Sequence, residues 1–315
     1  MTSLHLPLGS LTHELGPVHL TPEDAGWTWT GLKVFDLPAG GSVSFTLDGH
    51  EGVLLPLSVQ DVTALVDGET FAIEGRTSVF ARVSDFVYCG LGSEVTLSSP
   101  TGGELAVCTS VCDVRMPAKY GAAEDVAVEV RGGGQATRSI SNFMSPEAWD
   151  HAAKIMCVEV YTPDGNWSSY PPHKHDDSPE CEVNNEEIYY FRIGDAGTSD
   201  YSEHGFGMHR TYTGQLPDGT LEIDENVCVR DGDVFLVPRG YHGPCIAAPG
   251  YDMYYLNVLA GPGGERSMAF CDDPAHHWIR DTWSEDDLDP RCPLVTADGK
   301  SAHERPQGAN SQEQQ

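Results

Sequence analysis

The sequence predicts an all-β protein built as a sandwich or barrel. Short runs of alternating apolar and polar residues recur at close spacing, and residues 42–47 (Ser-Val-Ser-Phe-Thr-Leu) have the period of two that is typical of a half-buried strand. Turn signals such as Asp48-Gly49 and Asp67-Gly68 separate these runs. No strong helical pattern interrupts the first third of the chain. Many short strands joined by Gly- and Pro-rich turns are typical of sandwiches and barrels.

The expected strands follow one another along the chain with few helices between them. In order, they cover residues 32–37, 42–47, 52–57, 61–66, 70–73, 86–89, 94–97, 125–130 and 155–161. One short helix is expected at Ser145-Pro146, because serine is a good N-cap and proline fits the first helical position. Beyond it, the second half repeats the strand-and-turn texture of the first half and adds a group of histidines.

These patterns divide the chain into three parts. Residues 1–125 predict an N-terminal barrel without metal ligands, since its histidines are dispersed among turns. Residues 126–288 predict a second barrel, which contains the clustered histidines. Residues 289–315 are expected to form a polar, mobile tail, because such a composition buries too little apolar surface to order itself.

The charge of the chain excludes some partners. Its 48 acidic residues against 18 basic ones give a net charge of −30. Nucleic acid and anionic membrane surfaces are therefore not expected as partners, because phosphate binding needs clustered Lys and Arg. No apolar run approaches the length of a membrane span. A small anionic substrate remains compatible, since a few local arginines or a metal can reverse the local field.

The cysteines and the N-terminus predict a cytoplasmic location. The first residues, Met1 to His5, have no basic segment followed by an apolar one, as a signal peptide would. Nine cysteines, an odd number, are scattered along the chain and are expected to be mostly reduced thiols. A homo-oligomer is also expected, because a barrel without ligands and sheet edges that need cover favour a closed assembly.

The candidate metal-binding motif is His173-Lys174-His175, and Glu187 and His242, further along the chain, are the other two candidate ligands. Residues two apart on a strand project from the same face, so His173 and His175 can converge on one ion. With a carboxylate and the third histidine, His242, they form a mixed nitrogen and oxygen site with open positions. Such a site suits one divalent ion per chain, with Zn as the first choice and Mn, Fe, Ni or Co as alternatives.

Two glutamates compete for the role of the carboxylate ligand. Glu180 lies in a loop-like acidic stretch, whereas Glu187 begins a run of β-branched and aromatic residues, Ile188 to Phe191. A strand position aims a side chain more reproducibly than a loop does. We therefore expect Glu187 to be the ligand and the intervening acidic stretch to be an inserted loop.

The two blocks that carry these ligands resemble the paired motifs of cupins. The match is imperfect: Gly165 stands seven residues before His173 rather than five, and one residue instead of two separates Gly240 from His242. Longer stretches are similar to the 5-deoxy-glucuronate isomerase family of myo-inositol catabolism, a bicupin family related to the ketol-isomerase that acts on 5-keto-4-deoxyuronate. The stretches that carry this resemblance are residues 166–175, 186–190, 237–242, 251–261 and 273–278.

The resemblance implies a bicupin fold, with two jelly-roll-like barrels, and an aldose–ketose isomerase. The implied reaction converts 5-deoxy-D-glucuronate to 2-deoxy-5-keto-D-gluconate through an enediol. A divalent ion would polarise the carbonyl and stabilise the enediolate. Two other functions fit the same ligands: an Fe(II) cupin dioxygenase, and a non-enzymatic bicupin that binds a sugar.

The remaining site residues are open at this level. The candidates for the proton-transferring base, chosen because they lie near the metal segments in sequence, are Asp252, Tyr254, Tyr241 and Glu222. The candidates for substrate binding are Arg239, Lys174, Tyr241 and Trp167. Lys174 is expected to face away from the two ligand histidines in a regular strand, which makes Arg239 the better candidate for the substrate carboxylate. The paired tyrosines at 189–190 and 254–255 could line the pocket or belong to the core.

Overall fold

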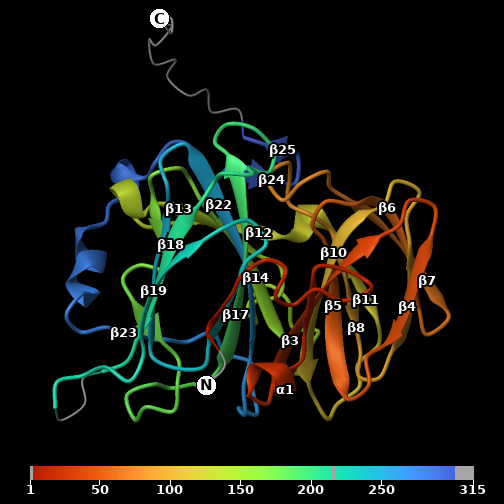
Figure 1. The fold of residues 1–315 in the computed structure, drawn as a ribbon, viewed down its shortest axis with the longest axis horizontal. Coiled ribbons are helices and arrows are strands. Elements are labelled where there is room, and N and C mark those ends of the chain that lie inside the picture. Colours follow the sequence, from red (N-terminus) through yellow and green to blue (C-terminus); the bar gives the residue numbers. More distant parts are fainter. Residues whose placement is uncertain (1–2, 215–217, 302–315) are drawn as a thin grey trace, which may run out of the picture.

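The strands of the protein form two β-barrels that lie side by side (Figure 1). The structure, a computed structural model, describes residues 3–214 and 218–301. Each barrel consists of two main antiparallel sheets. This arrangement confirms the all-β prediction. None of the helices in the described part of the chain combines the length and apolar character needed to cross a membrane.

The first barrel pairs a six-stranded sheet with a four-stranded one. The six-stranded sheet has the order β11-β8-β5-β10-β3-β2, from β2 (Val18–Leu20), β3 (Thr30–Leu37), β5 (His50–Pro56), β8 (Phe86–Cys89), β10 (Gly103–Val111) and β11 (Lys119–Gly121). The four-stranded sheet has the order β4-β9-β6-β7, from β4 (Ser42–Thr46), β6 (Gln60–Val66), β7 (Glu69–Gly75) and β9 (Glu94–Ser98). The strand expected at residues 42–47 is thus β4, which ends one residue earlier.

The second barrel pairs a seven-stranded sheet with a six-stranded one. The seven-stranded sheet has the order β1-β20-β17-β22-β14-β13-β12, from β1 (His5–Leu6), β12 (Ala127–Arg131), β13 (Arg138–Asn142), β14 (Met156–Thr162), β17 (Glu186–Asp195), β20 (Val234–Val237) and β22 (Tyr251–Ala260). The other sheet contains β15 (Trp167–Ser168), β16 (His173–Lys174), β18 (Gly207–Tyr212), β19 (Asp224–Val229), β21 (Tyr241–Ala247) and β23 (Cys271–Asp272). Because β1 pairs with β20, the first strand of the chain belongs to the second barrel, unlike the predicted 1–125 domain.

Helices are few and short, as expected, but the predicted one is only a turn. The carbonyl oxygen of Ser145 accepts hydrogen bonds from the backbone N–H groups of Ala148 and Trp149, and the helical turn ends there. The α-helix α1 (Pro22–Ala25) instead has a complete capping box, because Thr21 and Asp24 satisfy each other's backbone groups. Alanine at position 148 cannot supply that second half of the cap. The 3₁₀-helices are η1 (Ala123–Asp125), η2 (Gly134–Ala136), η3 (His277–Thr282) and η4 (Glu285–Asp287).

The buried apolar residues of the described chain form three cores, and one of them joins the two barrels. One lies inside each barrel, and a third lies between the six-stranded sheet of the first barrel and the seven-stranded sheet of the second. Strand β17 contributes to two of them: Ile188 and Tyr190 pack between the barrels, whereas Tyr189 and Phe191 point into the second barrel. This alternation follows from the pleat. Alternate side chains of the seven-stranded sheet therefore face the interior of the second barrel, where they can contribute to a site.

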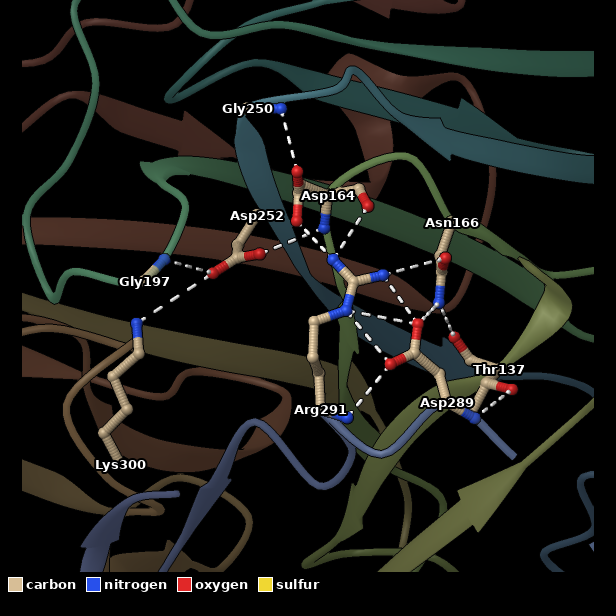
Figure 2. Close-up of polar contacts among 9 residues, drawn as sticks. All are labelled: Thr137, Asp164, Asn166, Gly197, Gly250, Asp252, Asp289, Arg291 and Lys300. Carbon is tan, nitrogen blue, oxygen red and sulfur yellow. Dashed lines mark hydrogen bonds and ion pairs between the residues drawn. The ribbon is translucent and has the colours of Figure 1, made fainter. Parts of the chain in front are cut away.

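The predicted mobile tail is wrong for residues 289–301. Strands β24 (Val295–Thr296) and β25 (Gly299–Lys300) form a hairpin, and Leu294 and Val295 join the core between the barrels. Arg291 is held by Asp289 and Asp164, as Figure 2 shows. The segment is polar on average, but it contains two buried apolar residues, Leu294 and Val295, and an arginine that is paired with acidic residues. Residues 302–315 lie outside the described part of the chain.

Replacing Leu294 with alanine tests whether this segment contributes to stability. Leu294 is 7% exposed, and truncating a buried leucine removes both transfer free energy and packing. We expect Leu294→Ala to lower the free energy of unfolding by about 2–4 kcal/mol, measured by urea denaturation. Leu8, which is 58% exposed, is the matched control, and Leu8→Ala should change stability by less than about 0.5 kcal/mol. Equal effects of the two substitutions would contradict the docking of residues 289–301.

Candidate active site

The four predicted metal ligands come from three strand regions of the second barrel. His173 lies on β16 and pairs directly with His242 on β21. His175 follows β16, and Glu187 is the second residue of β17. The six-stranded sheet therefore supplies the histidines and the facing seven-stranded sheet supplies the carboxylate.

The side chains of three of these residues meet in the barrel interior. Oε2 of Glu187 lies 3.0 Å from Nε2 of His175 and 3.1 Å from Nε2 of His242. The three possible ligand atoms lie within 4.8 Å of one another, and all three residues are buried. The ring of His173 lies beside them, with its centroid 4.5 Å from that of His242. Glu180 is elsewhere: its carboxylate accepts a hydrogen bond from Nζ of Lys174 at 2.6 Å.

The histidine rings are oriented by the main chain. In each ring Nδ1 lies near a backbone carbonyl oxygen: Pro171 at 3.2 Å for His173, Asn185 at 3.0 Å for His175, and Gly240 at 3.4 Å for His242. A carbonyl can only accept, so Nδ1 is the donor in each of these contacts, and Nε2 is the ring atom left to ligate an ion. Nε2 of His242 is buried without a hydrogen-bond partner. Lone pairs that converge with a carboxylate fit a divalent cation.

The cluster shifts the pKa values of its members in different directions: those of His173 and Glu187 move towards the ligating forms, whereas the pKa of His175 is raised, because its burial is outweighed by its hydrogen bond with Glu187 and its attraction to that carboxylate. Burial, together with the neighbouring His242 and His175, lowers the pKa of His173 well below 6.5. Burial alone would raise the pKa of Glu187, but His242 and His175 outweigh it and the pKa is lowered. A neutral imidazole and an ionised carboxylate are the ligating forms of these side chains.

The cluster opens into a cavity of about 620 Å³ on the inner face of the seven-stranded sheet. Polar, charged and apolar side chains line it besides the ligands. The hydroxyl groups include those of Ser169, Tyr189 and Tyr255, the cations are Arg131, Arg138 and Arg280, the acidic residues are Glu129 and Glu147, the amides are Asn142 and Asn257, and the apolar walls include Ile140, Val158, Val160 and Leu259. Oγ of Ser169 lies 3.1 Å from the hydroxyl of Tyr189 and 2.9 Å from that of Tyr255. These three hydroxyls form a connected chain next to the ligand cluster.

The other predicted substrate-binding residues do not line this cavity. Lys174, Arg239 and Tyr241 line a separate hollow of about 210 Å³, together with Glu222. Arg239 forms an ion pair with Glu222 there. The pleat explains the position of Lys174, which faces away from His173, as the sequence indicated. Tyr241, the residue before His242 on β21, likewise lies in that separate hollow, and Arg239 precedes the strand.

The predicted catalytic residues also lie elsewhere. The hydroxyl of Tyr254 donates to Oε1 of Glu159 at 2.8 Å in the core between the barrels. Asp252 accepts a hydrogen bond from the backbone N–H of Asp164 at 3.0 Å and lies 3.9 Å from Nζ of Lys300 (Figure 2). Both residues are on the outer face of β22. Proximity in sequence to the metal segments was therefore misleading, because alternate residues of the strand serve different sides of the sheet.

Trp167 lies outside the cavity as well. Its ring packs 5.4 Å from that of Tyr170, and both line a hollow of about 530 Å³ that includes Trp283. Of the paired tyrosines, only Tyr189 and Tyr255 face the ligand cavity. Sequence reasoning missed Ser169, Arg138 and Asn257. The alternation of Arg138, Ile140 and Asn142 on one strand was the signal that could have revealed an inward-facing arginine.

A disulfide bond joins the inserted loop to the barrel. Cys181 in the loop and Cys271 on β23 are bonded, with Cα atoms 5.6 Å apart. Seven cysteines are free, so the expectation of mostly reduced thiols holds for the other positions. Phe270, next to Cys271, lines the cavity and lies with its ring centroid 4.9 Å from that of His173. The disulfide therefore joins two segments that flank the ligand cluster.

Comparison with known proteins identifies the family. The model of the KduI/IolB family matches residues 9–279. The chain belongs to the KduI/IolB family. This result confirms the resemblance seen in the sequence, and it covers the cavity strands and all four predicted ligands.

Relatives within the KduI/IolB family are similar over most of their length. A 5-deoxy-glucuronate isomerase of Geobacillus kaustophilus (strain HTA426) is 38% identical over 286 residues, covering 90% of this chain and 97% of the relative. The protein of the same name from Bacillus subtilis (strain 168) is 37% identical over 272 residues, covering 85% and 92%.

Solved structures agree with the fold. The crystal structure of an IolB-like protein from Salmonella typhimurium LT2 is similar with a TM-score of 0.76 and 32% identity, covering 88% of this chain and 99% of that one. An oxalate decarboxylase of Lactobacillus farciminis, in a formate complex, has a TM-score of 0.59 at 11% identity, covering 86% and 89%. The second likeness concerns the fold alone, which is cupin-like.

Proposed function

We propose that this chain is a 5-deoxy-glucuronate isomerase that converts 5-deoxy-D-glucuronate to 2-deoxy-5-keto-D-gluconate with a bound divalent ion. The observation that carries the proposal is the convergence of His175, Glu187 and His242, with His173 beside them, at a cavity that also contains arginines. Relatives of that name, 38% identical over 90% of the chain, support it. They favour an isomerase over the dioxygenase or the sugar-binding protein.

Different residues of the cavity would serve different steps of such a reaction. His173, His175, Glu187 and His242 would hold the ion, which polarises the carbonyl and stabilises negative charge on the enediol oxygens. The main-chain carbonyls at Nδ1 keep the rings oriented. The hydroxyl chain of Ser169, Tyr189 and Tyr255 can donate to substrate oxygens and pass a proton between them. The apolar walls limit access of water to the intermediate.

Nuclear magnetic resonance of the reaction mixture tests this proposal. Purified protein loaded with Zn or Mn is incubated with 5-deoxy-D-glucuronate, and the aldehyde signal is followed. We expect the aldehyde signal to fall and a ketone carbon to appear, with incorporation of deuterium from D₂O at the former aldehyde carbon, which gains a proton when the enediol collapses to the ketone. Protein treated with a chelator is the control. Absence of conversion by protein with a full complement of metal would overturn the assignment.

Three further properties belong to the same proposal. The donor set accepts several divalent ions, and we retain Zn as the first choice with Mn, Fe, Ni and Co as alternatives. The cytoplasmic location is supported by the seven free cysteines. The homo-oligomer stays a prediction, which analytical ultracentrifugation can check.

A further inference from the structure

Arg138 is a buried cation without a carboxylate partner. It lies on β13, is 4% exposed and lines the ligand cavity. Its Nη1 donates to the carbonyl oxygen of Ala136 at 3.2 Å, and no ion pair joins it to a carboxylate in the described part of the chain. Buried charges in proteins are normally paired. An unpaired guanidinium at a cavity therefore indicates a missing anion.

The other two cations of the cavity are already satisfied. Arg131 forms a hydrogen-bonded ion pair with Glu129, with distances of 2.8 Å. Arg280 binds both oxygens of Asp272 at 2.5 and 2.6 Å. Burial, together with repulsion from Arg131 and Arg280, lowers the pKa of Arg138 to about 10, although Tyr255 and the Arg131-paired Glu129 oppose this effect. Arg138 is thus the cavity cation that gains most from an incoming anion.

A second unpartnered donor faces the same cavity. Nδ2 of Asn257 is buried and has no hydrogen-bond partner among residues 3–214 and 218–301, and the residue is 4% exposed. Asn257 lies on β22 opposite Tyr189 of β17 and Val158 of β14, on the face that bears the cavity. An amide donor between the ligand cluster and an arginine suits a hydroxyl or carboxylate oxygen of a substrate.

Arg138 shares its cavity with a chain of hydroxyl groups that begins at Tyr255. Arg138 on β13 and Tyr255 on β22 are separated in the sheet by β14 alone. From Tyr255 the hydroxyl chain runs through Ser169 to Tyr189, whose ring centroid lies 6.1 Å from that of His242. The cavity is therefore lined by the His/Glu cluster, by hydroxyls that are hydrogen-bonded to one another, and by the guanidinium of Arg138, which lies 5.5 Å from the centroid of the Trp283 ring and forms no ion pair within the part of the chain that the structure describes.

We propose that Arg138 binds the carboxylate of the sugar acid and so sets the direction in which the substrate enters. The aldehyde end then lies at the His/Glu cluster, and the hydroxyl-bearing carbons lie along Ser169 and Tyr189. Arg138 is a specificity-determining residue that takes no part in the proton transfer. The proposal rests on the proposed function, and it replaces Arg239, whose ion pair with Glu222 lies in a different hollow.

Substrate selectivity tests this assignment. Wild type, Arg138→Gln and Arg138→Lys are each assayed with 5-deoxy-D-glucuronate and with the neutral aldose in which a hydroxymethyl group replaces the carboxylate. Loss of a charged hydrogen bond predicts that Arg138→Gln lowers kcat/KM for the uronate by about 10- to 100-fold, mainly through KM. The neutral aldose should change by less than about 3-fold, and Arg138→Lys should restore part of the uronate activity.

Controls separate this role from a structural one. Arg115, an exposed arginine paired with Asp67, is the matched control, and Arg115→Gln should leave both substrates unaffected. Metal content and thermal unfolding are measured for each variant, because misfolding would reduce activity toward both substrates together. If Arg138→Gln does not fold, Arg138→Lys decides by the same ratio.

The outcomes distinguish this inference from the proposed function. Turnover by the wild type with an unchanged ratio of uronate to neutral-aldose activity in the variants would overturn the role of Arg138 alone. Equal activity of the wild type toward both substrates would do the same. Absence of turnover by the wild type would overturn the proposed function and this inference together.

Discussion

Arg76→Ala is expected to lower the free energy of unfolding by about 3–5 kcal/mol, because it leaves a buried charge without its partner. Arg76 is 1% exposed and forms an ion pair with Glu159, which is equally buried. Its Nε also donates to the carbonyl oxygen of Pro56 at 2.9 Å, and Nη1 donates to the hydroxyl of Tyr161 at 3.1 Å. One arginine thus joins a strand of the first barrel to the central sheet of the second. Urea denaturation followed by tryptophan fluorescence measures the loss.

Two comparisons isolate the cause of this effect. Arg115→Ala removes an arginine from an exposed ion pair and should cost less than about 1 kcal/mol. The double variant Arg76→Met, Glu159→Leu removes both charges, and it should recover much of the loss, since apolar residues can replace a buried pair. A loss below about 1 kcal/mol for Arg76→Ala would show that water or another group compensates Glu159.

The barrel-to-barrel contact shows what the sequence could not predict about the fold. Alternation within residues 42–47 is a local signal, and it predicted β4 to within one residue. Arg76 and Glu159 are 83 positions apart, and nothing local indicates that they meet. The burial of Leu294 and Val295 is likewise a tertiary effect, since their neighbours are polar and the apolar partners come from other strands. Local patterns give strands, whereas the pairing of sheets depends on distant contacts.

The same distinction between local sequence patterns and distant contacts applies to the candidate site. His173 and His175 were predicted as ligands because two residues on one strand face the same way, and Glu187 was preferred over Glu180 because it begins a strand; the structure brings the rings of both histidines and Glu187 together. The proton-transfer candidates Asp252 and Tyr254 lie outside the ligand cavity for a related reason: they were chosen by nearness in the chain without regard to the pleat. Tyr254 and Tyr255 are adjacent, yet one packs between the barrels and the other faces the cavity.

Arg138 illustrates the remaining gap. It belongs to β13, two strands away from β22 in the sheet and more than thirty positions before His173 in the chain. No motif includes it. Its importance becomes visible only when the absence of an ion pair is compared with the pairing of Arg131 and Arg280. The alternation of Arg138, Ile140 and Asn142 indicates at most that the arginine faces inward, whereas its lack of an ion pair depends on tertiary contacts that sequence patterns do not encode.

Glu187→Gln is expected to lose most of the bound metal and to lower kcat/KM by on the order of 10³-fold, which corresponds to several kcal/mol of lost transition-state stabilisation. Oε2 of Glu187 is the oxygen shared by His175 and His242, and an amide neither carries the charge nor coordinates as strongly. Metal content is measured by plasma mass spectrometry after dialysis. Thermal unfolding with and without added Zn gives a readout independent of activity, since a bound ion stabilises the folded state.

Glu180→Gln is the matched control, because the two glutamates compete for the same role in the sequence. The Glu180 side chain is 55% exposed and binds Lys174 on the far side of the strand. Its substitution should leave metal content and kcat/KM within about 2-fold of wild type, as expected for an exposed ion pair. His175→Ala should behave like Glu187→Gln. The reverse pattern, with metal lost in Glu180→Gln and kept in Glu187→Gln, would mean that the inserted loop folds over the histidines and supplies the ligand itself.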